Sequence, residues 1–181
     1  MCIIITKPAG AKMPPKAILD RCADLNPHGF GFATKDRTFK TLSRSEFFRE
    51  LKTIGKYETA ILHFRYATHG SIKEENCHPF RDEITGVSFA HNGILDIATA
   101  NDMTDSETAF RNVIAPAIRE HGYQSDEFIM AVYSVIGSSR FAFIDSEGEY
   151  RLFGPFTQYK GCWYSNRNFM PYVRPSRSYA Y

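Results

Sequence analysis

The sequence predicts an α+β protein built from antiparallel sheets with helices packed outside them, a pattern that permits a layered α/β/β/α sandwich. Two observations lead to this fold class. Apolar runs and helical segments come in groups, whereas a doubly wound parallel sheet needs them to alternate one to one. The runs are also almost continuously apolar, as expected for sheets covered on both faces.

Short runs with the composition of β-strands occur along the whole chain, each bounded by Gly, Pro, Asn or Asp. The expected strands are Cys2 to Thr6, Gly31 to Thr34, Thr59 to Arg65, Gly86 to Ala90, Arg140 to Asp145, Tyr150 to Phe153 and Gly161 to Ser165.

Helices are expected between these groups of strands. Ser43 to Glu46 forms a capping box, in which a serine hydroxyl caps the helix that follows. The expected helices are KAILDRCADL (16–25), FFRELKTI (47–54), a helix that begins near Thr104 and is kinked or divided at Pro116, and Asp126 to Val135.

Composition limits the class of protein. The 181 residues are expected to form one domain, 1–181, without a membrane span, and the net charge of +2 does not by itself indicate a nucleic-acid partner. The start of the chain lacks the basic and apolar regions of a signal peptide, so we expect a soluble cytoplasmic protein. Cys2, Cys22, Cys77 and Cys162 are far apart and contain no C-x-x-C pair, which favours reduced thiols.

The chain begins MCIIIT, which places a thiol directly after the initiator methionine. Methionine aminopeptidases remove Met1 efficiently when the next residue is small, and cysteine is small. A mature chain that starts at Cys2 carries a thiol and a free α-amine on one carbon, a nucleophile with its own base. The alternative is that Cys2 is a small apolar residue at the start of a buried strand.

The stretch LHFRYATHG (62–70) places Arg65 where an apolar strand stops. A guanidinium at this position can bind a carboxylate through two parallel hydrogen bonds, although an edge arginine with a surface ion pair has the same pattern. No metal or other cofactor is expected, because the histidines His63, His69, His78 and His91 form no HxH or HxxxH pair.

Two further stretches have both a structural and a chemical interpretation. In SFAHNGIL (88–95), Asn92 and Gly93 form either a hairpin turn or a pair of donors, one side-chain amide and one backbone N–H, for an oxyanion. In TDSETAF (104–110), Thr104 and Glu107 form a capping box, and Asp105 in the first helical turn is placed to face a cationic group.

These stretches occur together in a known family. In its motifs, the sequence resembles the class II glutamine amidotransferase domains of the N-terminal-nucleophile hydrolase superfamily. The resemblance runs in order through Met1-Cys2, NPHGFGFA (26–33), HFRYATHG with NCHPF after it (63–80), FAHNGIL (89–95) and TDSE (104–107). It implies a four-layer αββα sandwich of two antiparallel sheets.

The resemblance also implies a role for each matching residue. Cys2 would be the nucleophile and its α-amine the base, and Asn92 and Gly93 would form the oxyanion hole. Arg65, assisted by Thr68 and His69, would bind the substrate α-carboxylate, and Asp105 the α-ammonium. The chain departs from the family at the loop before the second strand, where Asn26-Pro27-His28-Gly29 replaces the usual arginine-glycine loop.

Three functions remain open from the sequence. The first is a glutaminase that supplies ammonia to a separate acceptor enzyme, because 181 residues leave no room for a fused acceptor domain. The second is an amidohydrolase of γ-glutamyl peptides, and the third is a non-catalytic binding module that retains Met1. The first of these is the leading hypothesis, and it makes glutamine the expected substrate.

The end of the chain, 168–181, is expected to be a surface tail. It contains two prolines and no clear period, and the segment from Arg151 onwards is basic and aromatic with no acidic residue. Such a tail either lies against its own domain or docks on the acceptor enzyme. Contact with nucleic acid is a less favoured interpretation, and no membrane partner is expected.

Overall fold

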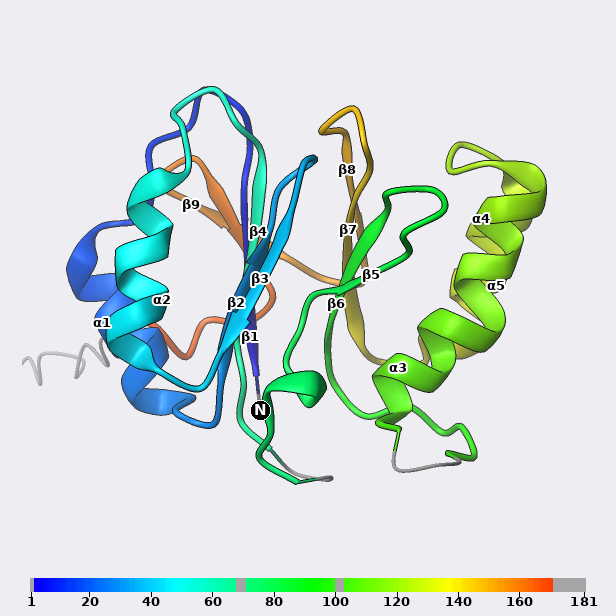
Figure 1. Ribbon diagram of the computed structural model, residues 1–181, viewed down its shortest axis with the longest axis horizontal. Helices are drawn as coiled ribbons and strands as arrows, with labels where there is room; N and C mark the ends of the chain where they lie inside the picture. Colours follow the sequence, from blue (N-terminus) through cyan, green and yellow to red (C-terminus); the bar gives the residue numbers. More distant parts are fainter. Residues whose placement is uncertain (1, 68–70, 100–102, 171–181) are drawn as a thin grey trace, which may run out of the picture.

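A computed structural model describes residues 2–67, 71–99 and 103–170 of the chain, arranged in four layers (Figure 1). Helices α1 (Lys16–Leu25) and α2 (Arg44–Glu50) cover the outer face of a six-stranded sheet. Helices α3 (Asp105–Ala109), α4 (Ala115–His121) and α5 (Asp126–Val135) cover the outer face of a four-stranded sheet. The sheets face each other in the middle, which confirms the expected αββα sandwich.

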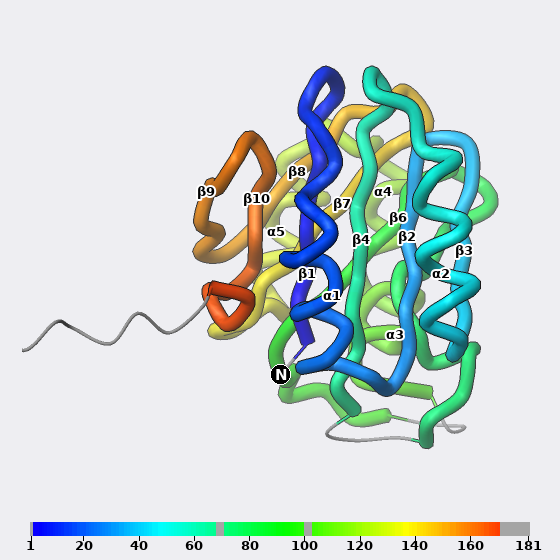
Figure 2. Tube along the Cα trace, turned by 90° about the vertical axis from the view of Figure 1, so that its left-hand side faces the viewer, coloured from blue at the N-terminus to red at the C-terminus, as the bar shows by residue number. Residues whose placement is uncertain are grey.

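Both sheets are antiparallel throughout. The six-stranded sheet, seen with its helices in front in Figure 2, has the order β3 (Thr38–Thr41), β2 (Phe30–Ala33), β4 (Ala60–Phe64), β1 (Ile3–Lys7), β10 (Cys162–Tyr164) and β9 (Thr157–Tyr159). The four-stranded sheet has the order β5 (Phe80–Arg81), β6 (Ser88–Asn92), β7 (Arg140–Ile144) and β8 (Tyr150–Phe153). Short 3-10 turns lie at η1 (Leu51–Thr53) and η2 (Glu74–Asn76).

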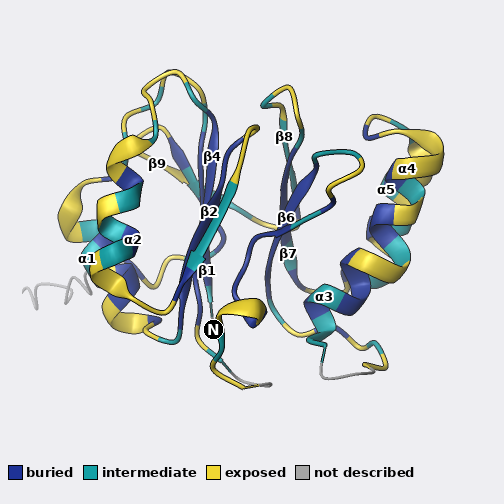
Figure 3. Ribbon diagram, viewed as in Figure 1, coloured by how far each residue is buried: buried dark blue, intermediate teal, exposed yellow. Residues whose placement is uncertain are grey.

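Three apolar clusters fill the spaces between the layers, and Figure 3 shows the central strands and the inner helix faces as buried. Phenylalanines dominate the two outer clusters, between each sheet and its helices. The cluster between the sheets is made of smaller residues, and its buried members are Ile4, Ala33, Ile61, Ala90, Ala142 and Ile144. Strands β1, β4 and β6 are buried along their whole length, including the polar residues Ser88, His91 and Asn92 of β6.

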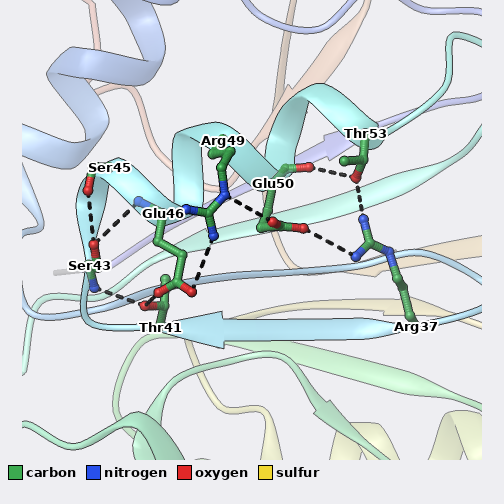
Figure 4. A network of polar contacts seen from close by, with 8 residues as sticks. All are labelled: Arg37, Thr41, Ser43, Ser45, Glu46, Arg49, Glu50 and Thr53. Carbon is green, nitrogen blue, oxygen red and sulfur yellow. Dashed lines mark hydrogen bonds and ion pairs between the residues drawn. The ribbon is translucent and has the colours of Figure 1, made fainter.

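The cap at the start of α2 differs in part from the predicted capping box (Figure 4). Ser43 Oγ accepts a hydrogen bond from the Glu46 N–H at 3.3 Å, as the pattern predicts. The Glu46 carboxylate instead accepts from the Thr41 hydroxyl at 2.6 Å, and Thr41 Oγ1 accepts from the Ser43 N–H at 3.0 Å. Arg37, on the turn before β3, pairs with Glu50 at 3.6 Å. These contacts tie α2 to the β2–β3 hairpin.

The third predicted helix is divided, and Pro116 explains where. Helix α3 passes into a π-helical turn, η3 (Phe110–Ile114), before α4 begins at Ala115 with Pro116 in its first turn. Because proline has no N–H and crowds the preceding turn, the regular hydrogen-bond ladder cannot continue through it. The wider π turn joins the two segments without separating them.

Strands β3, β5 and β9 were not predicted. β5 has only two residues, β9 is the largely exposed TQY, and β3 lies at a sheet edge, so none forms a recognisable apolar run. The strand predicted at Gly86 to Ala90 is shifted, because β6 runs from Ser88 to Asn92. In the part of the chain that the structure describes, no helix is both long and apolar enough to cross a bilayer.

Candidate active site

Cys2 lies directly before β1, at the end of the sandwich marked N in Figure 1. Because β1 and β4 are antiparallel with Ile3 opposite Phe64, Cys2 and the residues after β4 meet at this end. The Cys2 Sγ accepts a hydrogen bond from the Tyr66 N–H at 3.3 Å and lies 3.6 Å from the Tyr66 carbonyl oxygen. The Asn166 side-chain amide donates to the Cys2 carbonyl at 2.8 Å. The thiol is therefore held by backbone on both sides.

A cavity of about 580 Å³ opens beside Cys2. Four segments that are far apart in the sequence line it: Cys2 before β1, Arg65 after β4, Gly93 after β6 and Asp105 at the start of α3. Four of the residues predicted from the sequence thus share one cavity, and they come from both sheets and one helix.

The other three predicted residues are placed differently. Asn92 is 1 % exposed and is not among the described residues that line the cavity, although it directly precedes Gly93. Thr68 and His69 lie outside the described residues.

Burial raises the pKa of the Cys2 thiol above its usual value near 9.0. The Tyr66 N–H and the positive charge of Arg65 act in the opposite direction but do not cancel the effect of burial. The thiol is therefore protonated at neutral pH, and a base must remove its proton before the sulfur becomes a strong nucleophile.

Arg65 is 4 % exposed, and its position is set by the chain around it. Its backbone N–H donates to the Gly29 carbonyl at 2.8 Å, and its guanidinium donates to the Ser71 carbonyl at 3.1 Å. The His28 ring packs on Tyr66 with centroids 5.0 Å apart, and His28 Nδ1 accepts from the Ala67 N–H at 3.0 Å. The loop that departs from the family thus contacts the two residues after Arg65.

Asn92 is the last residue of β6, and its side chain contacts Ser165, the residue that follows β10 in the other sheet. Its side-chain amide donates to Ser165 Oγ at 2.9 Å, and the same oxygen accepts from the Ile4 N–H at 2.8 Å. The Asn92 Oδ1 is buried and has no hydrogen-bond partner among the described residues. Ser165 therefore links the end of β6 to β1, the strand that follows Cys2.

Gly93 is required at its position for two reasons. Its φ of +154° is disfavoured for residues with a side chain. A Cβ atom there would also lie 2.1 Å from Ser139 Oγ and 3.0 Å from His91 Nε2. The backbone after β6 can approach the cavity only because this residue is glycine.

Asp105 is the first residue of α3, and Thr104 caps that helix by accepting from the Glu107 N–H at 3.1 Å. The Asp105 carboxylate accepts from the Leu95 N–H at 2.9 Å and from the Ser106 N–H at 2.7 Å. It thereby fixes the loop that follows Gly93, and the positive end of the helix dipole favours its charge.

Three buried histidines are grouped at the cavity, and two of them, His78 and His91, line it. His63 and His78 stack with ring centroids 4.4 Å apart, and His78 and His91 are 6.3 Å apart. Burial lowers the pKa of His63 to about 3 and that of His91 to about 4, and it also holds the pKa of His78 well below its usual value. All three are therefore neutral at neutral pH. In the described ranges, no three His, Cys, Asp or Glu side chains are grouped as metal ligands.

The sequence did not indicate several contacts of this site. His91 Nδ1 lies 2.7 Å from Ser106 Oγ, which in turn lies 3.1 Å from Asp105, so a polar chain runs from β6 to α3. Ser165 and Asn166 contact the site from the other end of the chain. A single Ser or Asn in a loop carries no sequence signal, and these contacts become visible only after folding.

Comparisons with known proteins identify the family of this chain. The family model described as glutamine amidotransferases class-II matches residues 34–152, more than half of the chain. The chain belongs to this family. Class II glutamine amidotransferases that resemble it include glutamine–fructose-6-phosphate aminotransferase (isomerizing) of Mycobacterium tuberculosis, which is 34% identical over 91 residues. The Streptococcus pneumoniae R6 enzyme of the same name is 35% identical over 101 residues.

These curated relatives are much longer than the matched segment. The match with the M. tuberculosis protein covers 43% of this chain and 14% of that protein, and the S. pneumoniae match covers 49% and 17%. The similarity therefore concerns only the amidotransferase domain.

Solved structures extend the similarity of fold over almost the whole chain. Glutamine phosphoribosylpyrophosphate amidotransferase from B. subtilis, complexed with ADP and GMP, superposes with a TM-score of 0.58 over 91% of this chain and 41% of that chain, at 17% identity. The allosteric regulatory enzyme of purine biosynthesis gives 0.53 over 81% and 36%, at 21% identity. The four-layer αββα fold is thus shared with these two proteins.

Proposed function

We propose that this chain hydrolyses the side-chain amide of glutamine through a thioester on Cys2, after removal of Met1. The observation that carries the proposal is the convergence of Cys2, Arg65, Gly93 and Asp105 on one cavity. A buried cation and a carboxylate are the two groups that a free α-amino acid requires, since it carries one charge of each sign. Arg65 then binds the α-carboxylate and Asp105 the α-ammonium.

In the proposed reaction, the Cys2 α-amine takes the thiol proton as the sulfur attacks the amide carbon. An α-amine has an unperturbed pKa of about 7.7–8.0, so roughly a fifth to a third of it is neutral and able to act as a base near pH 7.4. The same group then returns the proton to the departing ammonia. This assignment suits a thiol whose pKa is raised by burial, because the base is on the same residue and needs no further positioning.

The oxyanion of the tetrahedral intermediate is proposed to bind the Gly93 N–H and the Asn92 amide. A half-turn of the Asn92 amide brings Oδ1 to Ser165, whose hydroxyl proton can then be donated to it. The NH2 group becomes free, and an oxygen that is buried without a partner gains one. This rearrangement supplies the second donor that the reaction needs.

We further propose that the released ammonia is used by a separate acceptor enzyme. The curated relatives are named as aminotransferases to fructose 6-phosphate, and the matched segment covers only 14–17% of their length. In this proposal, an acceptor enzyme outside residues 1–181 uses the ammonia that this chain releases. The expectation that 168–181 forms a docking tail concerns mainly 171–181, which lie outside the described residues; Phe169 before them is buried against Tyr164 with ring centroids 4.0 Å apart.

The direct test replaces the nucleophile. We expect Cys2→Ala to lower glutamine hydrolysis by at least about 10³-fold while the thermal midpoint of unfolding stays within a few degrees, because the thioester cannot form. Alanine still permits removal of Met1. The matched control is Cys22→Ala, which removes a buried thiol on α1 and should leave kcat within about twofold. Equal activity of Cys2→Ala and wild type would contradict the mechanism.

A further inference from the structure

The cavity beside Cys2 is larger than glutamine needs. Its volume of about 580 Å³ lies inside the range of roughly 300–1,000 Å³ that is typical of sites for drug-sized ligands. Glutamine has only about ten non-hydrogen atoms, so at protein packing density it fills roughly 150–200 Å³. Most of the cavity therefore remains for a group attached beyond the γ-amide.

Lys73 adds a second cation to the lining of this cavity. It is half-buried and directly precedes η2. Among the described residues, no carboxylate lies within ion-pair distance of its ammonium, whereas Lys16 and Lys35 both have such a partner. Lys73 is therefore available to bind an anion.

The backbone around Lys73 is fixed to Arg65. The Ser71 carbonyl accepts hydrogen bonds from the Arg65 guanidinium at 3.1 Å and from the Asn76 side-chain amide at 3.0 Å. The Asn76 N–H donates to the Lys73 carbonyl at 3.2 Å. The two cations thus belong to one hydrogen-bonded segment, and Lys73 keeps a defined place relative to the proposed glutamine site.

The cavity lining has one more positive charge than free glutamine needs, because both Arg65 and Lys73 line it, whereas glutamine has one carboxylate. In the proposed function, Arg65 and Asp105 already neutralise the α-carboxylate and the α-ammonium. A γ-glutamyl amino acid carries one more carboxylate, on the amine that leaves, and Lys73 matches it. Apolar residues at the same opening, including Ile94 and Ile97, offer a surface for the side chain of that amino acid.

We propose that the cavity accepts γ-glutamyl amino acids, with Lys73 binding the carboxylate of the leaving amino acid. This inference rests on the proposed function of Cys2. The Cys2 sulfur bonds to the γ-carbonyl carbon, the amide C–N bond breaks, and the thiol proton passes through the α-amine to the leaving amine. Water then adds to the thioester, the S–C bond breaks and one water proton returns to the sulfur, so glutamate and a free amino acid are released.

The experiment compares three substrates with the full-length protein. L-Glutamine tests the basal reaction, γ-L-glutamyl-L-alanine adds a leaving group with a carboxylate, and γ-L-glutamylethylamide has the same leaving group with the carboxylate removed. The quantity is kcat/KM for glutamate release. In the wild type, we expect kcat/KM for the dipeptide to be about tenfold higher than for the ethylamide, because one charged hydrogen bond stabilises a complex by about that factor.

Variants assign the effect to Lys73. Lys73→Met should reduce the ratio of dipeptide to ethylamide to near one, and Lys73→Arg should largely restore it. Lys52→Met, which removes an exposed lysine from η1, should leave the ratio at its wild-type value.

Each outcome decides a different claim. If the wild type hydrolyses glutamine but shows no preference for the dipeptide over the ethylamide, the inference is overturned and the proposed function stands. An unchanged ratio in Lys73→Met also overturns it. If no substrate yields glutamate, the proposed function fails and the inference fails with it.

Discussion

The space between the two sheets has an apolar centre and a polar end. In the centre, an apolar cluster packs between the sheets, and its buried members are Ile4, Ala33, Ile61, Ala90, Ala142 and Ile144. Small polar residues adjoin it, because Thr6 pairs with Ile61 and Ser88 with Ile144. At the end near Cys2, the described residues include His63, His78, His91 and Asn92, each with a buried polar side-chain atom that has no hydrogen-bond partner. The same pair of sheets thus supports two different environments that adjoin each other, since Ile4 of the apolar cluster lies opposite His63 in the pairing of β1 with β4.

The contrast between the two regions indicates that the apolar centre contributes mainly to folding stability and the polar end mainly to function. A buried polar group without a partner costs about 1–3 kcal/mol of folding free energy, so the polar end is unfavourable for folding. Such costs are expected to persist where the groups are needed for a reaction. The apolar centre holds the sheets together, and the strand ends are then free to present unfavourable groups to the cavity.

The largest effect should come from the polar end. We expect Asn92→Ala to lower kcat for glutamine by about 10²–10³, because it removes one proposed oxyanion donor, with a smaller change in KM. Steady-state kinetics measure both quantities.

Ser165→Ala is the matched control for this prediction. It removes the partner that Asn92 contacts in the structure, so both variants lose the same hydrogen bond. A merely structural Asn92 would give both variants similar losses of stability and activity. The account requires a clearly larger loss of kcat in Asn92→Ala.

The apolar centre should respond in stability and hardly in activity. Ala142 is 0 % exposed between the sheets, and Ala142→Leu adds three carbon atoms where no space exists. We expect the free energy of unfolding to fall by about 1–3 kcal/mol, while kcat of the folded protein stays within about twofold. Ala17→Leu makes the same change at an exposed position of α1 and should be nearly neutral. Loss of activity without loss of stability in Ala142→Leu would remove the distinction between the regions.

A further effect is a dependence of stability on pH that arises at the polar end. An unfolded histidine titrates near pH 6.5, whereas burial lowers the pKa of His91 to about 4 and that of His63 to about 3. The unfolded state therefore binds more protons below pH 6.5. Stability should be complete above that pH and fall as the pH drops towards 4, by up to about 1.4 kcal/mol per pH unit for each histidine.

Denaturant unfolding at pH 7.0, 6.0 and 5.0 measures this dependence. His63→Gln keeps a donor near the His91 carbonyl but cannot titrate, so its stability should fall less steeply. His121→Gln, at an exposed histidine, is the control and should keep the wild-type slope. Parallel slopes for wild type and His63→Gln would show that His63 is not buried in its neutral form.

The sequence predicted the fold well where local signals are strong. The bounds of α1 and α5 agree with the expected 16–25 and 126–135, because Pro15 and Ser125 mark their starts. The two-residue strand β5 and the edge strands β3 and β9 were missed, since their pairing depends on neighbours and not on their own composition. Local sequence patterns thus predict the helices and the central strands, whereas the short edge strands depend on the strands with which they pair.

The site was predictable only in part. Taken singly, Cys2, Arg65 and Asp105 each had a structural explanation, and their common cavity was expected only through the resemblance to a family. Asn92 and Ser165 are separated by 73 positions in the sequence, and Cys2 and Asn166 by 164 positions. No local sequence pattern predicts contacts over such separations. Long-range polar contacts are therefore what the structure adds.

The central claim is that Cys2 is an N-terminal nucleophile, and mass spectrometry tests it most directly. The full-length protein, expressed without an N-terminal tag, is treated with a diazo-ketone analogue of glutamine, and its intact mass and peptide masses are measured. We expect a chain that has lost Met1 and carries one adduct, located on Cys2, while Cys22, Cys77 and Cys162 remain unmodified. A chain that retains Met1, or an adduct on one of the other three cysteines, would contradict the account.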